Sequence, residues 1–236
     1  MDPFLNFPVS RLGEIRALIF DLDGTLYDPR GFARRLVLAR PGEGFLMLAE
    51  RRIRKGLAGA DYDSAGAYYG EFFSRMSHAT GRSAERLRSW YFDRYIPLMC
   101  GILKKHYRPR PGTAELFEWL TAGGFPFAVY SDYPRTAERL SSLGLGPALG
   151  ARLYGPEDFG AQKPAARPFL SIARDLGLPP DCILVAGDRD DTDGAGAAAA
   201  GMAYIGITNH TKRGRSPSVS WETFNALLRE QLKFPG

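Results

Sequence analysis

Cysteine is scarce in this sequence. The 236 residues include only Cys100 and Cys182, which lie far apart and have no second cysteine or histidine at the spacing of metal ligands. Their number and spacing indicate neither a disulfide framework nor a zinc site. We therefore expect both cysteines to be core residues.

Long hydrophobic runs are also missing. No segment approaches the ~18 consecutive apolar residues of a membrane-spanning helix. Residues 1–8 do not show the basic stretch followed by an apolar stretch that a secretory leader has. With 236 residues, of which 44% are hydrophobic, the sequence predicts a soluble globular protein with a sizeable core. We expect it to be cytoplasmic and to have no membrane partner.

Acidic residues are fewer than basic ones, 26 against 31, which gives a formal net charge of +5. This excess suits an anionic partner, either a phosphorylated small molecule or a nucleic acid. Because the excess is modest and its residues lie mostly on solvated helical faces, we favour the small-molecule phosphate ester. No pattern indicates an oligomeric state. The basic segment 209–217 is predicted to be a solvated surface loop rather than a phosphate-binding element.

The stretch 17–26, Ala-Leu-Ile-Phe-Asp-Leu-Asp-Gly-Thr-Leu, contains closely spaced acids after an apolar run. Its first four residues predict a buried strand. Since side chains two apart lie on one side of a strand, Asp21 and Asp23 should face one crevice at its carboxyl end, where open α/β sheets bind ligands. The two carboxylates repel each other unless a cation lies between them or one of them is protonated. Both arrangements are found in catalytic sites. Gly24 permits a sharp turn there.

The segment from about residue 29 to 107 contains no β-rich run, and its apolar residues recur at helical spacing. We predict an all-helical insert. Three stripes are expected to face its core: Phe45, Leu48, Ala49, Ile53 and Leu57; Tyr68, Tyr69, Phe72, Phe73 and Met76; and Leu87, Trp90, Tyr91 and Tyr95. For these aromatic residues we favour a core role over stacking on a substrate.

After this insert, strands and helices alternate. The Pro- and Gly-containing stretch 108–113 reads as a return linker, and Thr113 is placed to cap the next helix. The pattern predicts strands at 127–130, 151–154, 183–186 and 203–207, and helices at 113–122, 137–143, 168–176, 194–201 and 221–232. This alternation indicates an α/β fold with a doubly wound parallel sheet. The predicted domains are an α/β core, residues 11–28 and 108–236, and a helical domain, residues 29–107.

Two further polar residues are expected to lie near the crevice. Ser131 directly follows strand 127–130, so its hydroxyl and the backbone N–H of Asp132 can donate to a phosphate oxygen, although a turn or cap is the ordinary role of such a serine. Lys163 lies in a loop where the chain crosses the crevice. Its ammonium can neutralise charge on a phosphoryl group and on a nucleophilic carboxylate.

Four acids within six residues follow strand 183–186: Asp188, Asp190, Asp191 and Asp193. One or two of them can cap the alanine-rich helix that follows, but four are too many for capping. Hard oxygen ligands that face Asp21 and Asp23 from a neighbouring strand suit Mg²⁺. The sequence therefore predicts a magnesium site.

These motifs, in this order, resemble the four signature motifs of the haloacid dehalogenase-like hydrolases, phosphatase branch. Asp21-Leu22-Asp23-Gly24-Thr25-Leu26 corresponds to the first, Ser131 to the second, Lys163 to the third, and Asp188 with Asp193 to the fourth. The resemblance covers about residues 15–208 and implies a Rossmann-like core, and residues 29–107 look like the C1-type helical cap. The filling Arg189-Asp190-Asp191 departs from the family pattern. It leaves Asp190, Asp191 and Asp193 as alternatives for the second metal contact, of which we choose Asp193.

The resemblance implies a Mg²⁺-dependent phosphatase that acts on a small phosphorylated metabolite. Asp21 would form an aspartyl-phosphate that water hydrolyses, and Asp23, with a suitably raised pKa, would serve as acid and base. Mg²⁺ would be held by Asp21, the Asp23 carbonyl, Asp188 and Asp193. The phosphate contacts would come from Thr25, Ser131, Asp132 and Lys163. The helical cap would exclude water and select the leaving group.

Several alternatives stay open beside this interpretation. The family's 2-haloacid dehalogenases typically lack the acid corresponding to Asp23, which argues against dehalogenation. Phosphonate hydrolysis needs an activated cap lysine, and nothing marks Lys55, Lys104 or Lys105 as one. A phosphosugar mutase shares all four motifs and would need a bisphosphate activator. A catalytically silent binding protein is disfavoured because every chemical position is filled.

Overall fold

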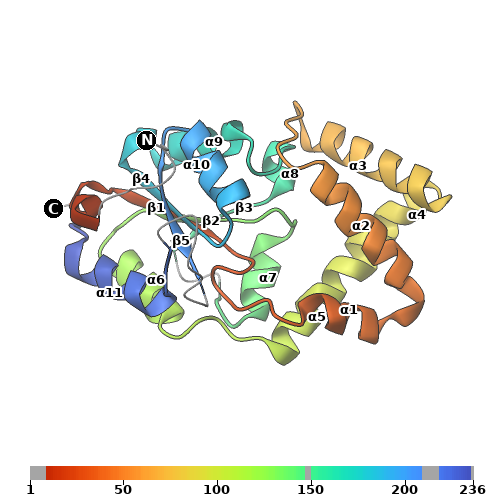
Figure 1. The fold of residues 1–236 in the computed structure, drawn as a ribbon, viewed down its shortest axis with the longest axis horizontal. Helices are drawn as coiled ribbons and strands as arrows, with labels where there is room; N and C mark the ends of the chain where they lie inside the picture. The colour runs from red at the N-terminus through yellow and green to blue at the C-terminus, as the bar shows by residue number, and fades with distance from the viewer. Residues whose placement is uncertain (1–8, 147–149, 209–217, 235–236) are drawn as a thin grey trace.

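A six-stranded sheet lies at the centre of the computed structural model, which describes residues 9–146, 150–208 and 218–234 (Figure 1). The strands are β1 (Ala17–Asp21), β2 (Phe127–Tyr130), β3 (Arg152–Tyr154), β4 (Ile183–Gly187), β5 (Ala203–Ile207) and β6 (Ser218–Val219). They pair in the order β3-β2-β1-β4-β5-β6, and every pair is parallel. The chain direction across the sheet reverses between β1 and β4, the switch point where such sheets bind ligands. The predicted α/β parallel sheet is confirmed.

Strand β1 is buried on both faces by helices. Ala17 and Ile19 share a hydrophobic cluster with residues of α9 (Ala166–Leu176) and α10 (Ala195–Ala199). Leu18 and Phe20 share the other cluster with residues of α6 (Thr113–Ala122) and α11 (Trp221–Gln231). In Figure 1 these two helix pairs lie on opposite sides of the sheet. The uninterrupted apolar run 17–20 follows from this double coverage.

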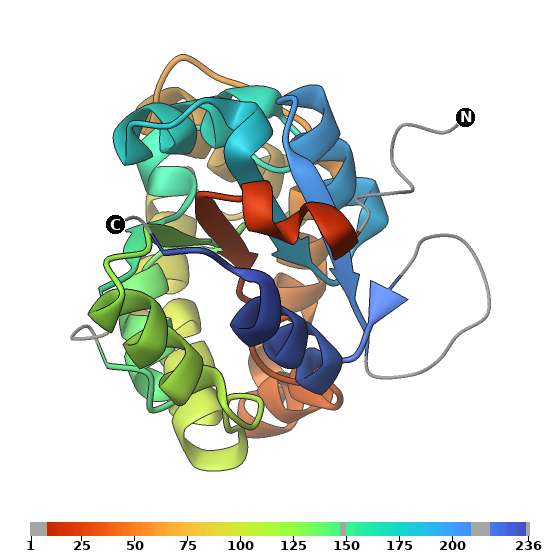
Figure 2. The same cartoon turned by 90° about the vertical axis from the view of Figure 1, so that its left-hand side faces the viewer.

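The chain between β1 and β2 forms helices and no strand, over a stretch that is described throughout. The helices are α1 (Phe32–Ala39), α2 (Gly44–Gly56), α3 (Ala65–Thr80), α4 (Ala84–Ser89) and α5 (Ile96–His106), with a π-helical segment, Trp90–Tyr95, between α4 and α5; α6 then leads back to the sheet. Helices α1 to α5 gather beyond one end of the sheet, as the right side of Figure 1 shows. In Figure 2 the sheet lies nearer the viewer and most of this segment lies behind it.

Two of the three predicted apolar stripes in this segment are confirmed. The residues of the stripes 68–76 and 87–95 are all buried, and their aromatic rings pack against one another, for example Phe72 and Tyr91 with centroids 5.3 Å apart. The aromatic residues therefore form the core of the helical segment, as expected.

The stripe predicted on α2 is confirmed only in part, at the buried Ala49 and Leu57. Phe45 and Leu48 are 62% and 67% exposed, and Ile53 is half-buried. The inner face of α2 instead includes Met47 and the fully buried Glu50. Apolar residues lie on both faces of α2, and Glu50 occupies a buried position as a member of an ion pair, so hydrophobic periodicity selects Phe45 and Leu48 in place of the buried Met47.

Three local predictions also need correction. Gly112, not Thr113, is the N-cap of α6, and the Thr113 hydroxyl donates to the Arg110 carbonyl instead. Cys100 and Cys182 are half-buried rather than core residues. The alanine-rich helix is shorter than expected, since a π-helical segment, Asp190–Gly194, precedes α10.

Other elements were not predicted or lie outside the described part. The short helix α8 (Pro156–Phe159) and strand β6 were missed, while α7 (Thr136–Ser142) agrees with the predicted helix to within one residue. The predicted surface loop 209–217 lies outside the described residues. Within those residues, no helix is both long enough and apolar enough to span a membrane.

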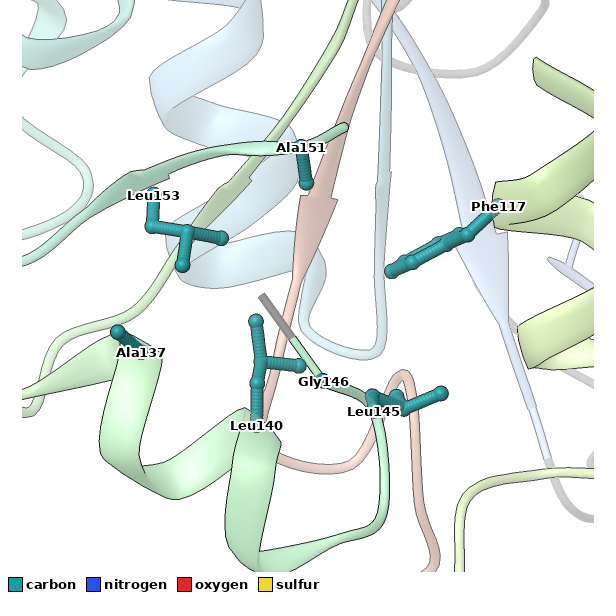
Figure 3. Close-up of a pocket in the computed structure, with 7 residues that line it drawn as sticks. All are labelled: Phe117, Ala137, Leu140, Leu145, Gly146, Ala151 and Leu153. Carbon is teal, nitrogen blue, oxygen red and sulfur yellow. The ribbon is translucent and has the colours of Figure 1, made fainter. Parts of the chain in front are cut away.

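A small space lies between α7, β3 and α6 (Figure 3). It is lined by Phe117, Ala137, Leu140, Leu145, Gly146, Ala151 and Leu153. Its volume of about 10 Å³ is at most that of a single water site. This space is a packing gap in the core rather than a ligand site.

Candidate active site

The ends of three strands converge at the switch point of the sheet. Asp21 is paired with the last residue of β2, and β1 and β4 are paired up to Ala186. Ser131 and Asp188, which directly follow β2 and β4, therefore leave the sheet on either side of Asp21. The parallel sheet thus brings together residues that are more than 100 positions apart in sequence.

Asp21 is buried and held by two donors. The Lys163 ammonium lies 2.6 Å from its Oδ1, and the Thr25 hydroxyl donates to its Oδ2 at 2.9 Å. Loss of hydration raises the pKa of Asp21 to about 7, against the opposing charge of Lys163. Lys163 also donates to Asp193 at 2.7 Å, and although burial alone lowers its pKa, the charges of Asp193 and Asp21 hold that pKa well above its usual value.

Three acids meet at this point. Asp21, Asp188 and Asp193 each offer a carboxylate oxygen within 4.8 Å of the other two. Loss of hydration, with the Asp21 charge beside it, raises the pKa of Asp188 to about 7, and burial raises that of Asp193 to about 6 against the charge of Lys163. Three hard oxygen donors this close together suit a divalent cation such as Mg²⁺.

The structure separates the acids that the sequence left as alternatives. Asp190 and Asp191 are exposed, and Asp191 is paired with Arg189 at 2.7 Å. Asp193 is buried in the cluster with Asp21. The position of Asp193 agrees with our choice of it, and its contact with a metal stays a prediction.

Two glycines allow this close approach. Gly24 has a φ of +99°, in the left-handed region, and a Cβ there would collide with the Asp188 carboxylate. A Cβ on Gly187, the last residue of β4, would collide with Asp193. The glycines thus leave room for the acids that follow β4.

Asp23 has quite different neighbours. Its Oδ1 accepts a hydrogen bond from the Tyr27 hydroxyl at 2.6 Å and is ion-paired with Arg139, and its Oδ2 accepts one from Ser131 at 3.2 Å. Although burial favours the neutral acid, the Arg139 charge and these bonds keep the pKa of Asp23 below its usual value. The raised pKa that the acid role of Asp23 requires is therefore not met, because the charge and hydrogen bond of Arg139 and the hydrogen bond of Tyr27 together outweigh desolvation.

Ser131 and Asp132 connect the parts of the site. The buried Ser131 hydroxyl accepts hydrogen bonds from Arg139 at 2.7 Å and from the backbone N–H of Tyr133 at 3.1 Å. The Asp132 carboxylate accepts one from the backbone N–H of Lys163 at 3.1 Å. Both residues lie beside the acids as predicted. Their phosphate contacts, and that of Thr25, stay predictions.

Arg139 is the main residue that sequence reasoning missed. It lies on α7, is fully buried, and contacts both Asp23 and Ser131. Its position in the sequence places it on the buried face of the helix with Leu140 and Leu143, where an apolar residue is expected. A charged residue at such a position is itself a signal, because arginine is almost never fully buried without a partner.

A second missed group joins the site to the helical segment. The Tyr133 ring centroid lies 5.1 Å from the Arg139 guanidinium and 4.0 Å from that of Arg54, on α2. Arg54 also donates to the Tyr133 hydroxyl, and its Nε donates to the buried Glu50 at 3.0 Å. These contacts fix α2 against the loop that follows β2.

The order of the site residues and the parallel sheet point to one known family. A family model of haloacid dehalogenase-like hydrolases matches residues 15–201. The chain belongs to this family. The match spans β1, the helical segment, β2 to β4 and α10, and so includes all of the acids described above.

Curated relatives resemble the chain over most of its length. An N-acetylmuramic acid 6-phosphate phosphatase of Pseudomonas aeruginosa is 30% identical over 197 residues, which cover 80% of this chain and 82% of that protein. A phosphoglycolate phosphatase of Salmonella paratyphi A is 28% identical over 245 residues, covering 93% and 94%.

Solved structures confirm the fold. A putative beta-phosphoglucomutase from Thermotoga maritima has a TM-score of 0.60 at 19% identity and covers 92% of this chain and 99% of its own. A 2-haloacid dehalogenase from Pseudomonas syringae has a TM-score of 0.59 at 20% identity, with the same coverage. At these identities the likeness concerns the fold alone, which the two proteins share despite their different names.

Proposed function

We propose that this haloacid dehalogenase-like hydrolase is a Mg²⁺-dependent phosphatase that hydrolyses a phosphate monoester of a small metabolite. The observation that supports this most directly is the surroundings of Asp21. This carboxylate ends a strand at the switch point, lies 2.6 Å from the Lys163 ammonium, and has Asp188 and Asp193 within reach of a shared cation. The phosphatase names of the curated relatives agree with the proposal.

Asp21 is the proposed nucleophile. Its carboxylate attacks phosphorus, the bond from phosphorus to the ester oxygen breaks, and an aspartyl-phosphate forms. Water then attacks the same phosphorus atom, releases inorganic phosphate and restores Asp21. Lys163 opposes the negative charge of the phosphoryl group and the carboxylate, and Thr25 holds the carboxylate in place.

Asp23 is the proposed acid and base, and its neighbours favour one of these roles. Paired with Arg139, it is ionised and suited to take a proton from the attacking water. In the first step the same group would have to carry a proton to the leaving oxygen, which the Arg139 contact disfavours. Esters whose leaving groups depart without a proton are therefore expected to react fastest.

Mg²⁺ fits the donor set of the site. The side chains of Asp21, Asp188 and Asp193, together with the backbone carbonyl of Asp23, would hold it. When bound, the ion supplies positive charge that offsets the repulsion between the phosphate and the carboxylate. In the same proposal, residues 29–107 act as a cap on the core formed by residues 11–28 and 108–236.

The test is phosphate release from para-nitrophenyl phosphate with Mg²⁺ and without any bisphosphate. We expect Asp21→Asn to lower kcat by at least about a thousandfold, because an amide is a poor nucleophile. Asp191→Asn is the matched control, since Asp191 is exposed and outside the acid cluster, and it should keep its activity. Substantial phosphate release by a folded Asp21→Asn protein, or turnover that requires a bisphosphate, would contradict the proposal.

A further inference from the structure

A cavity of about 320 Å³ opens beside Asp23, between the sheet and the helical segment. Asp23, Tyr27 and Tyr133 line its sheet side, and residues of α1, α2 and α5 line the rest. In the proposed function the phosphate lies at Asp21. The cavity is then the space into which the alcohol half of the ester extends.

Helix α2 contributes the charged part of the wall. Met47, Leu48, Glu50, Arg51 and Arg54 line the cavity at the spacing of one helical face. Glu50 is paired with Arg54, and Asp23, the other lining acid, is paired with Arg139. Among the described residues that line the cavity, Arg51 is thus the charged side chain without an ion-pair partner, and it is exposed.

An arginine without an ion-pair partner on a ligand cavity suits a carboxylate. The guanidinium presents two parallel N–H donors that match the two carboxylate oxygens. A second phosphate, with close to two negative charges, would call for more than one cation without an ion-pair partner. The charges of the cavity therefore favour a ligand group with one negative charge.

The remaining wall is mainly apolar, with Phe32, Leu36, Met47 and Met99 among its residues. The described residues expose five large hydrophobic side chains, and two of these, Val37 at 43% and Leu48 at 67%, line this cavity. Exposed apolar side chains at a cavity mark a site that binds an apolar surface. A polyol would find few hydrogen-bond partners here, and a two-carbon group would leave most of the volume unfilled.

We propose that the alcohol half of the substrate has an apolar body and carries a carboxylate that binds Arg51. The inference depends on the proposed phosphatase function and narrows its substrate class. It separates the substrate of this chain from hexose phosphates and from phosphoglycolate, the substrate named for several relatives.

The experiment compares four phosphate esters of primary alcohols with the full-length enzyme and Mg²⁺. They are para-carboxybenzyl phosphate, benzyl phosphate, a hexose phosphate and phosphoglycolate. We expect kcat/KM to be about tenfold higher for the carboxybenzyl than for the benzyl ester, the gain of one charge-assisted contact. Both should exceed the hexose phosphate and phosphoglycolate.

Substitutions of two neighbouring arginines test whether Arg51 causes the preference for the carboxybenzyl ester. In Arg51→Met the preference for the carboxybenzyl ester should fall to about onefold, and Arg51→Lys should restore part of it. Arg52→Met is the matched control, because Arg52 lies on the outer face of α2, beside Phe45 and Ile53, and not on the cavity. It should keep the wild-type preference and activity.

The outcomes separate this inference from the proposed function. A preference for the hexose phosphate or phosphoglycolate, or a carboxybenzyl preference that survives in Arg51→Met, would overturn the substrate class and leave the phosphatase function standing. If no ester, including para-nitrophenyl phosphate, is hydrolysed, the phosphatase function fails and this inference fails with it.

Discussion

A single buried arginine decides how Asp23 can act. Arg139 is fully buried and pairs with Asp23 while it donates to Ser131 at 2.7 Å. A buried guanidinium so close to a carboxylate stabilises the ionised acid. The site therefore favours the base role of Asp23 over its acid role, and this balance is open to measurement.

Removal of the Arg139 charge should make Asp23 a better acid. In Arg139→Met we expect the ratio of kcat/KM for benzyl phosphate to that for para-nitrophenyl phosphate to rise about tenfold, because only the benzyl oxygen needs a proton to leave. Arg139→Lys keeps the charge and should stay near the wild-type ratio. A ratio that is unchanged or lower in a folded Arg139→Met protein would show that Asp23 is not limited by this contact.

The acid cluster predicts that metal binding depends on pH. The pKa values of Asp21 and Asp188 are about 7 and that of Asp193 is about 6, so below neutral pH a cation has to displace protons. We expect the affinity for Mg²⁺ to rise about tenfold from pH 6 to pH 8, with proton release in calorimetry. An affinity that does not change over this range would contradict the assignment.

The same pKa values fix the sign of a stability effect. Because the folded-state pKa values lie above the usual value near 3.9, the metal-free folded protein binds these protons more tightly than the unfolded chain. The protonated carboxyl groups of Asp21 and Asp188 therefore stabilise the folded protein below about pH 4, and this stabilisation is lost as the pH rises through 7. Added Mg²⁺ should offset this loss, which thermal unfolding of the metal-free and Mg²⁺-loaded protein would measure.

Helix α2 shows how a charged residue can occupy a buried position among apolar ones. Its inner face carries the Glu50–Arg54 pair, and Phe45 and Leu48 are exposed. Hydrophobic periodicity assumes that the more apolar face is buried, so it fails where a buried ion pair replaces apolar contacts. For the stripe with Phe72 and Met76 on α3, where burial is purely apolar or aromatic, the same reasoning succeeds.

The buried pair on α2 should matter more than a surface pair of the same spacing. Glu50→Ala leaves Arg54, only 18% exposed, without its carboxylate, and we expect a loss of about 2 kcal/mol in the free energy of unfolding. Glu71→Ala removes the exposed i,i+4 pair with Arg75 on α3 and should cost less than about 0.5 kcal/mol. Urea denaturation measures both, and equal losses would show that the buried pair adds no stability.

At the scale of the whole molecule, the sheet and its strand-end residues were predictable because their signals are local. An apolar run that ends in Asp21, and the acid-rich turn after β4, each mark a strand end, and parallel topology then brings them together. Arg139 and Tyr133 were missed because their roles depend on side-chain contacts between distant elements. The cavity beside Asp23 depends in the same way on how α2 is docked, which periodicity does not reveal.

The most direct test of the account is chemical trapping of the proposed intermediate. Borohydride reduces an aspartyl-phosphate to homoserine, so the enzyme is quenched with it during turnover of para-nitrophenyl phosphate and analysed by peptide mass spectrometry. We expect homoserine at position 21, dependent on both substrate and Mg²⁺. Steady turnover without this modification, or homoserine at position 23 or 188 in place of 21, would contradict it.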